Sequence, residues 1–106
     1  MFRQGDILIM PVAAESVPAH LQAAPRDARG RLVLALGEAT GHAHAVPGPG
    51  TLLLSRDSGF PEFLHLPDGG RLVHEEHAAI SLPKGWFRVV RQREYVPGSY
   101  HRYVAD

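Results

Sequence analysis

Histidine is the residue type that this sequence offers in excess for chemistry. Seven of the 106 residues are His, and four of them fall into two close pairs. The first pair is His42 and His44, and the second begins and ends the segment His74–His77, which reads His-Glu-Glu-His. Residues i and i+2 of a β-strand share a face, so the imidazoles of His42 and His44 would lie roughly 6 to 7 Å apart and could share one metal ion.

The second pair can complete a metal site if the two segments meet in space. Imidazole and carboxylate groups are the ligands of catalytic zinc, iron, manganese and nickel sites. In a regular strand His74 and Glu76 would face the same side. His77 joins them only if Glu75 and Glu76 form a turn.

We therefore predict a divalent metal ion as cofactor, its identity being zinc, iron, manganese or nickel. The predicted metal ligands are His42, His44, His74 and His77. Glu76 is the predicted catalytic residue, since it or Glu75 would be the nearest general base to an activated water. Two alternatives stay open: a non-catalytic module that binds a protein, an RNA or a small anion, and metal-free acid–base catalysis by a His pair.

The composition restricts the scaffold that must position these residues. A chain of 106 residues with 44% hydrophobic and 21% charged residues fits one globular domain, residues 1–106. Eleven basic and eleven acidic residues argue against a uniformly basic nucleic-acid binder. The absence of Cys excludes disulfides and thiolate ligands. Because no signal peptide or long apolar stretch is evident, we predict a cytoplasmic protein with no membrane partner.

Gly and Pro divide the sequence into short segments in which apolar residues alternate or run together, a pattern that favours an all-β fold. Seven or eight strands with at most one short helix, at 19–24, predict a small barrel or a two-sheet sandwich. Pro67–Gly70 has the composition of a hairpin turn. The predicted strands are 6–12, 31–36 continuing into 41–46, 51–55, 60–66, 71–74, 78–82 and 86–96.

Two further features concern partners. Arg91 and Arg93 share a face of the last predicted strand, where they would bind an anion such as a phosphate or carboxylate, or form ion pairs of little energetic value. The strand 6–12 contains Pro11, which is typical of a sheet edge, and an exposed edge could pair with a second copy to form a homodimer.

The segment Gly37–His44, Gly-Glu-Ala-Thr-Gly-His-Ala-His, is followed by Pro83-Lys84-Gly85 before a hydrophobic strand. Together they resemble the two halves of the cupin signature. That resemblance implies a small barrel in which His-x-His and a later His hold a metal. Since this chain has Arg88 where a cupin has the later His, His74, His77 or Glu76 would have to replace the missing ligands.

The chain also resembles a family of small bacterial proteins without an assigned function. Members carry a Gly-Glu-x-Thr-Gly-His-x-His, a His-x-Glu-His and a Gln-Arg-Glu-Tyr segment, which are residues 37–44, 74–77 and 92–95 here. This second resemblance implies no particular reaction.

Overall fold

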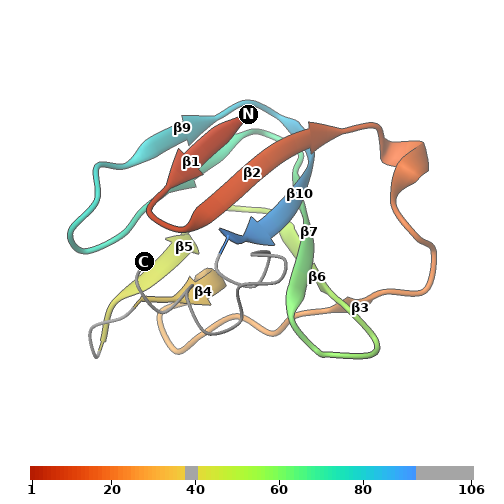
Figure 1. Cartoon of the computed structure of the whole chain (residues 1–106), viewed down its shortest axis with the longest axis horizontal. Helices are drawn as coiled ribbons and strands as arrows, with labels where there is room; N and C mark the ends of the chain where they lie inside the picture. Colours follow the sequence, from red (N-terminus) through yellow and green to blue (C-terminus); the bar gives the residue numbers. More distant parts are fainter. Residues whose placement is uncertain (38–40, 93–106) are drawn as a thin grey trace.

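The computed structural model describes residues 1–37 and 41–92, and within them it confirms the all-β prediction (Figure 1). The one helical element there is a short 3-10 turn, η1 (Ala14–Ser16). The described part of the chain contains no helix that could span a membrane. The strands are β1 (Phe2–Gln4), β2 (Ile7–Val12), β3 (Gln22–Ala23), β4 (Leu32–Leu36), β5 (Ala43–Val46), β6 (Thr51–Leu54), β7 (Pro61–Leu66), β8 (Gly70–Leu72), β9 (Ile80–Leu82) and β10 (Gly85–Arg91).

Six of these strands form an antiparallel sheet in the order β1-β2-β10-β7-β6-β3. The remaining four form two antiparallel hairpins, β4–β5 and β8–β9. Figure 1 shows the turn between β1 and β2 close to β5. The pairings of the described residues do not close a barrel, because β1 and β3 remain the two edges of the six-stranded sheet.

The core lies between the inner face of the large sheet and the two hairpins. Alternation along β2 decides which side chains enter it, since Ile7 and Ile9 are buried whereas Leu8 and Met10 are partly exposed. Burying each large apolar side chain contributes about 1.5–3 kcal/mol. The other large, fully buried side chains are Leu32, Leu34, Val46, Leu52, Leu64, Leu66, Leu72 and Phe87.

The run predicted from 31 to 46 is two strands rather than one. Strand β4 ends at Leu36, and β5 returns antiparallel to it, with Leu36 opposite Ala43. The amide N–H of Gly37 donates to the carbonyl oxygen of His42 (2.8 Å), which starts the return. Gly37 allows this close approach, because a Cβ on it would lie 2.8 Å from the Cβ of His42.

The predicted hairpin around Pro67–Gly70 is also wrong, because its two flanking strands belong to different sheets. Strand β7 pairs with β6 and β10, whereas β8 pairs with β9. The turn, with Gly69 at a φ of 74°, carries the chain from the large sheet to the second hairpin. Turn composition predicted the reversal but not the partner of each strand.

Three smaller predictions differ from the structure. Residues 19–24 form no helix, and part of them is β3. Strand β2 is not an edge, because β1, which the sequence pattern did not indicate, covers the side away from β10. The described chain therefore has ten strands instead of seven or eight. The last strand ends at Arg91, and its predicted continuation from residue 93 lies outside the described residues.

The connection from β3 to β4 is held by the carboxylate of Asp27. It accepts hydrogen bonds from the backbone N–H groups of Arg29 (3.0 Å) and Arg31 (2.8 Å) and from Nε of Arg31 (2.9 Å). Donation by the Arg31 backbone is the largest cause that lowers the pKa of Asp27 below its ordinary value of 3.8. This turn sets where β4 begins.

We expect Asp27→Asn to lower the free energy of unfolding at pH 7 and to have much less effect near pH 3. Because the folded-state pKa is depressed, the ionised carboxylate stabilises the fold above its unfolded-state pKa, and that contribution is lost as pH falls through the folded-state value. Urea denaturation of both proteins at the two pH values measures the difference. An equal difference at pH 7 and pH 3 would contradict this role.

Candidate functional site

The four histidines predicted as metal ligands lie together, although they come from two distant segments. We call His42, His44, His74 and His77 the histidine cluster. The ring of His74 is central, with centroids 4.4 Å from His44, 4.6 Å from His77 and 5.5 Å from His42. The rings of His44 and His77 stack at 5.8 Å. The structure thus brings together all four predicted ligands.

Backbone pairing between Ala45 and Val73 explains this convergence. The N–H of each residue donates to the carbonyl oxygen of the other, at 3.0 and 2.8 Å, in an antiparallel bridge. In that register the residue before Ala45 lies opposite the residue after Val73, which places His44 beside His74. One residue further, Ala43 lies opposite Glu75.

A bend after His74 brings His77 back to the cluster. The backbone N–H groups of Glu76 (3.0 Å) and His77 (3.4 Å) both donate to Nδ1 of His74. The chain therefore turns at Glu75 and Glu76 instead of continuing as a strand. The sequence pattern predicted that His77 would join the other three rings only if Glu75 and Glu76 formed a turn, and the structure has this turn.

His44 is the buried member of the cluster, and Gln4 fixes its orientation. Nε2 of Gln4 donates to the carbonyl oxygens of Leu72 and Ala78, both at 3.0 Å. Oε1 of Gln4 therefore faces Nδ1 of His44 at 2.9 Å and accepts a hydrogen bond from its N–H. The remaining ring nitrogen, Nε2 of His44, carries the lone pair and lies 3.6 Å from Oδ1 of Asp6.

His44 is neutral at pH 7. Burial, and secondly the positive charge of a protonated His74, lower the pKa of His44 from 6.5 to about 4, and the carboxylate of Asp6 only partly opposes this. A neutral imidazole with an oriented lone pair on Nε2 is the form that binds a metal ion.

The two glutamates of the bend have different surroundings. Oε1 of Glu75 accepts the backbone N–H of Ala43 at 2.9 Å, and this hydrogen bond is the main reason why the pKa of Glu75 is lowered. Oε1 of Glu76 lies 4.0 Å from Nδ1 of His42, on a side chain that is 72% exposed.

One ligand atom each from His42, His74 and Glu75 lie within 4.8 Å of one another. This set contains two of the four predicted ligands, His42 and His74, but not His44 or His77. Its carboxylate comes from Glu75, whereas the sequence predicted Glu76 as the acidic residue of the site.

Two glycines let the backbone form walls of the cluster. A Cβ on Gly5, whose φ is 59°, would lie 2.9 Å from Nε2 of His77, and a Cβ on Gly37 would lie 2.9 Å from Nε2 of His74. Gly5 belongs to the segment Gln4-Gly5-Asp6, which sequence analysis did not connect to the histidines. Gly5 and Asp6 form the turn between β1 and β2, and nothing in the local sequence reveals the distant contacts of this turn.

The last predicted strand, which carries Arg91 and Arg93, is described as β10 only as far as Arg91. Arg91 is close enough to His44 for its positive charge to lower the pKa of that imidazole slightly. Arg88 pairs with Glu62 at 3.6 Å. Arg93 lies outside the described residues.

The fold and the site define a small all-β protein with a partly buried histidine cluster at the junction of its two hairpins. Residues 3–92 match the family described as Domain of unknown function (DUF8820), and the chain belongs to that family. The matched range includes the entire histidine cluster and Gln4-Gly5-Asp6. No curated protein and no solved structure matches the chain.

Gln4→Leu should destabilise the protein by about 1–3 kcal/mol, because it removes the partners of two carbonyl oxygens and of the His44 ring in a buried place. Urea denaturation measures the change. Gln22→Leu is the matched control, since Gln22 is exposed on β3 and should change the stability little. Equal stability of Gln4→Leu and the wild type would show that Gln4 does not hold the cluster.

Proposed function

We propose that this protein binds one divalent transition-metal ion at the histidine cluster. The observation that carries the proposal is the meeting of His42, His74 and Glu75, with one ligand atom of each within 4.8 Å of the others. Nε2 of His44 and the carboxylate of Asp6 add two further potential metal ligands. Imidazole and carboxylate donors suit zinc, iron, manganese and nickel.

Ligands of one tetrahedral zinc ion are about 3.3 Å apart, given bonds of about 2.0–2.1 Å, and the potential ligand atoms of His42, His74 and Glu75 lie within 4.8 Å of one another. The bend 74–77 must adjust when the ion binds. Ligation through Nε2 of His74 places the proton on its Nδ1, which then no longer accepts the N–H groups of Glu76 and His77. Ligation through Nδ1 replaces the same two hydrogen bonds.

Catalysis is the second part of the proposal. A metal held by a partial set of protein ligands keeps a position for water or a small substrate. Glu76 is the proposed general base, because its carboxylate is exposed next to His42, whereas Glu75 is engaged with the Ala43 backbone.

Purified without a histidine tag, the protein is expected to bind one equivalent of Zn²⁺ or Co²⁺ in isothermal titration calorimetry. His42→Ala and His74→Ala should each weaken the affinity at least tenfold, about 1.4 kcal/mol. His20→Ala is the matched control, since His20 is exposed and outside the cluster. Amide resonances of Glu76 and His77 should shift on loading. Absence of saturable binding, or unchanged affinity in both cluster variants, would refute the metal site and leave a structural cluster.

Replacing each of the two glutamates by glutamine in turn distinguishes a metal ligand from a general base. Glu75→Gln should weaken Zn²⁺ binding about tenfold or more, because it removes a carboxylate from the closest ligand set. Glu76→Gln should change the affinity by less than about twofold, because its side chain is exposed. Both are measured by calorimetry at pH 7. The reverse order of effects would assign the ligand role to Glu76.

A further inference from the structure

The six-stranded sheet carries apolar side chains on both of its faces. Its inner face forms the core with the two hairpins. The opposite face, which we call the outer face, holds the alternate residues of the same strands. Cross-strand pairing aligns these residues in rows, such as Val12 beside Trp86. Six residues of the outer face are apolar and only partly buried: Leu8, Met10, Val12, Leu53, Trp86 and Val90.

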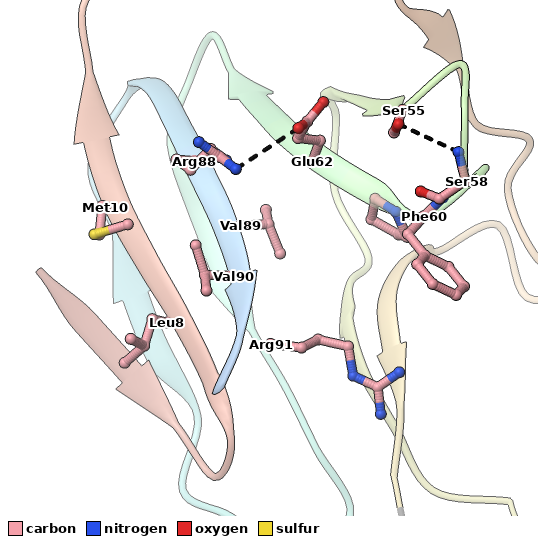
Figure 2. A pocket seen from close by; sticks show the side chains of 11 residues that line it. Leu8, Met10, Ser55, Ser58, Phe60, Glu62, Arg88, Val89, Val90 and Arg91 are labelled. Atoms are coloured by element: carbon pink, nitrogen blue, oxygen red, sulfur yellow. Dashed lines mark hydrogen bonds and ion pairs between the residues drawn. The ribbon is translucent and has the colours of Figure 1, made fainter. Parts of the chain in front are cut away.

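The side chains of β10 show which residues belong to the outer face. Figure 2 shows Arg88 and Val90 on one side of the β10 ribbon, and Val89 and Arg91 on the other. The guanidinium of Arg88 lies over the ring of Phe63, 5.5 Å from its centroid, and Phe63 is the residue opposite Arg88 on β7. Arg88 is therefore a residue of the outer face, whereas Arg91 is not.

The composition of the outer face is that of a surface with a partner. An antiparallel sheet that packs one face on the core commonly carries polar residues on the other. Strand β2 departs from this pattern, because its outward residues Leu8, Met10 and Val12 are all apolar. Contiguous apolar surface of this kind marks a site of interaction. The best partner is a second flat surface that is also largely apolar.

Two pairs of unlike groups lie side by side on β10 and β7, the two central strands of the sheet. Arg88 of β10 and Glu62 of β7 form an ion pair at 3.6 Å (Figure 2). The rings of Trp86 of β10 and His65 of β7 stack with centroids 4.1 Å apart. Each pair thus has one member on each strand.

This arrangement makes the outer face complementary to itself. A two-fold axis that runs between β10 and β7 places β10 of one copy opposite β7 of the other. Each Arg88 then faces Glu62 of the partner subunit. Each Trp86 faces His65 of the partner subunit. The chain has a formal net charge of zero, so two copies do not repel each other through net charge.

We propose that the outer face is the interface of a homodimer, in which the outer faces of two copies pack against each other about this two-fold axis. The sequence suggested a dimer through an exposed edge of strand 6–12, but β1 covers that edge of β2. The proposed contact uses the face of the sheet instead. None of the outer-face residues named above belongs to the histidine cluster, so the dimer goes beyond the metal-binding function.

The size of the outer face sets the expected strength of the dimer. Five strands about 4.8 Å apart, with about six residues at about 3.3 Å each, cover roughly 500 Å². A dimer therefore buries about 1,000 Å² in total, which is at the lower end for specific interfaces. Phe60, which is 54% exposed and borders the same side of β10 as Leu8 and Met10, adds apolar surface. We expect a dissociation constant in the micromolar range.

Sedimentation equilibrium of the tag-free full chain at about 1 to 500 μM covers this range. A metal chelator is present, so that no ion bridges two copies and the result does not depend on the metal site. We expect the weight-average mass to rise with concentration from one chain towards two. A single-chain mass at every concentration, or growth beyond two chains, would overturn the proposal.

Reversing the central charges tests whether this face is the interface. Arg88→Glu places acidic groups opposite each other, and Glu62→Arg places basic groups opposite each other. Each should raise the dissociation constant at least about tenfold. An equimolar mixture of the two variants should form a heterodimer, because an acidic face then meets a basic one. The ion pair within each chain is absent from both variants, so this recovery reports contact between chains.

Two further variants complete the test. Arg71→Glu, at an exposed position of β8 outside the outer face, is the matched control and should dimerise as the wild type does. Met10→Lys places a charge among the apolar residues and should weaken the dimer at least about tenfold, even if a charge reversal prevents folding. Circular dichroism verifies the fold of each variant. Unchanged dimerisation in Met10→Lys, or no heterodimer from two folded charge variants, would refute the interface.

Discussion

Two backbone hydrogen bonds between Ala45 and Val73 join the β4–β5 hairpin to the chain that follows β8. Everything about the histidine cluster depends on that register. A shift by one residue would turn His44 to the opposite face, because side chains alternate along a strand. In the observed register His44 lies beside His74, and Ala43 donates its N–H to Glu75. Backbone pairing and the side-chain cluster therefore support each other.

The cluster also depends on a buried hydrogen-bond network in which both ends of one amide side chain are engaged. Gln4 uses both ends of its amide, donating to the carbonyl oxygens of Leu72 and Ala78 and accepting from His44. Buried polar groups are costly unless they are paired, so this amide stabilises the fold and at the same time selects one tautomer of the imidazole. Nε2 of His44, which then carries the lone pair, lies 3.6 Å from Oδ1 of Asp6. One side chain of β1 thus both stabilises the fold and orients the His44 imidazole.

The histidine cluster lies where regular strand pairing stops. The bend after His74 replaces a strand. A continuous β-ladder satisfies the hydrogen bonds of its own backbone N–H and C=O groups and keeps the side chains at fixed spacings. An interruption of this kind brings a side chain such as His77 to a position that a flat sheet cannot supply. The regular strands in turn provide the rigid support for this irregular segment.

Local pattern alone established the fold class and the interior of this protein. Alternation around Ile7 and Ile9 indicated a strand with a buried face, and Gly and Pro indicated most of the chain reversals, because both effects act over a few residues. The sequence also indicated the four histidines as candidate metal ligands. It predicted that His77 joins the other three only if Glu75 and Glu76 form a turn.

Tertiary structure decided which segments become neighbours. The partner of β8, the covering of β2 by β1 and the contact of Gln4 with His44 join residues far apart along the chain, and no local preference encodes such contacts. Glu75 rather than Glu76 entered the closest ligand set because the backbone of Ala43 holds it there. The amino-acid sequence therefore determined which chemical groups are available, and the burial of one shared core decided which of them meet.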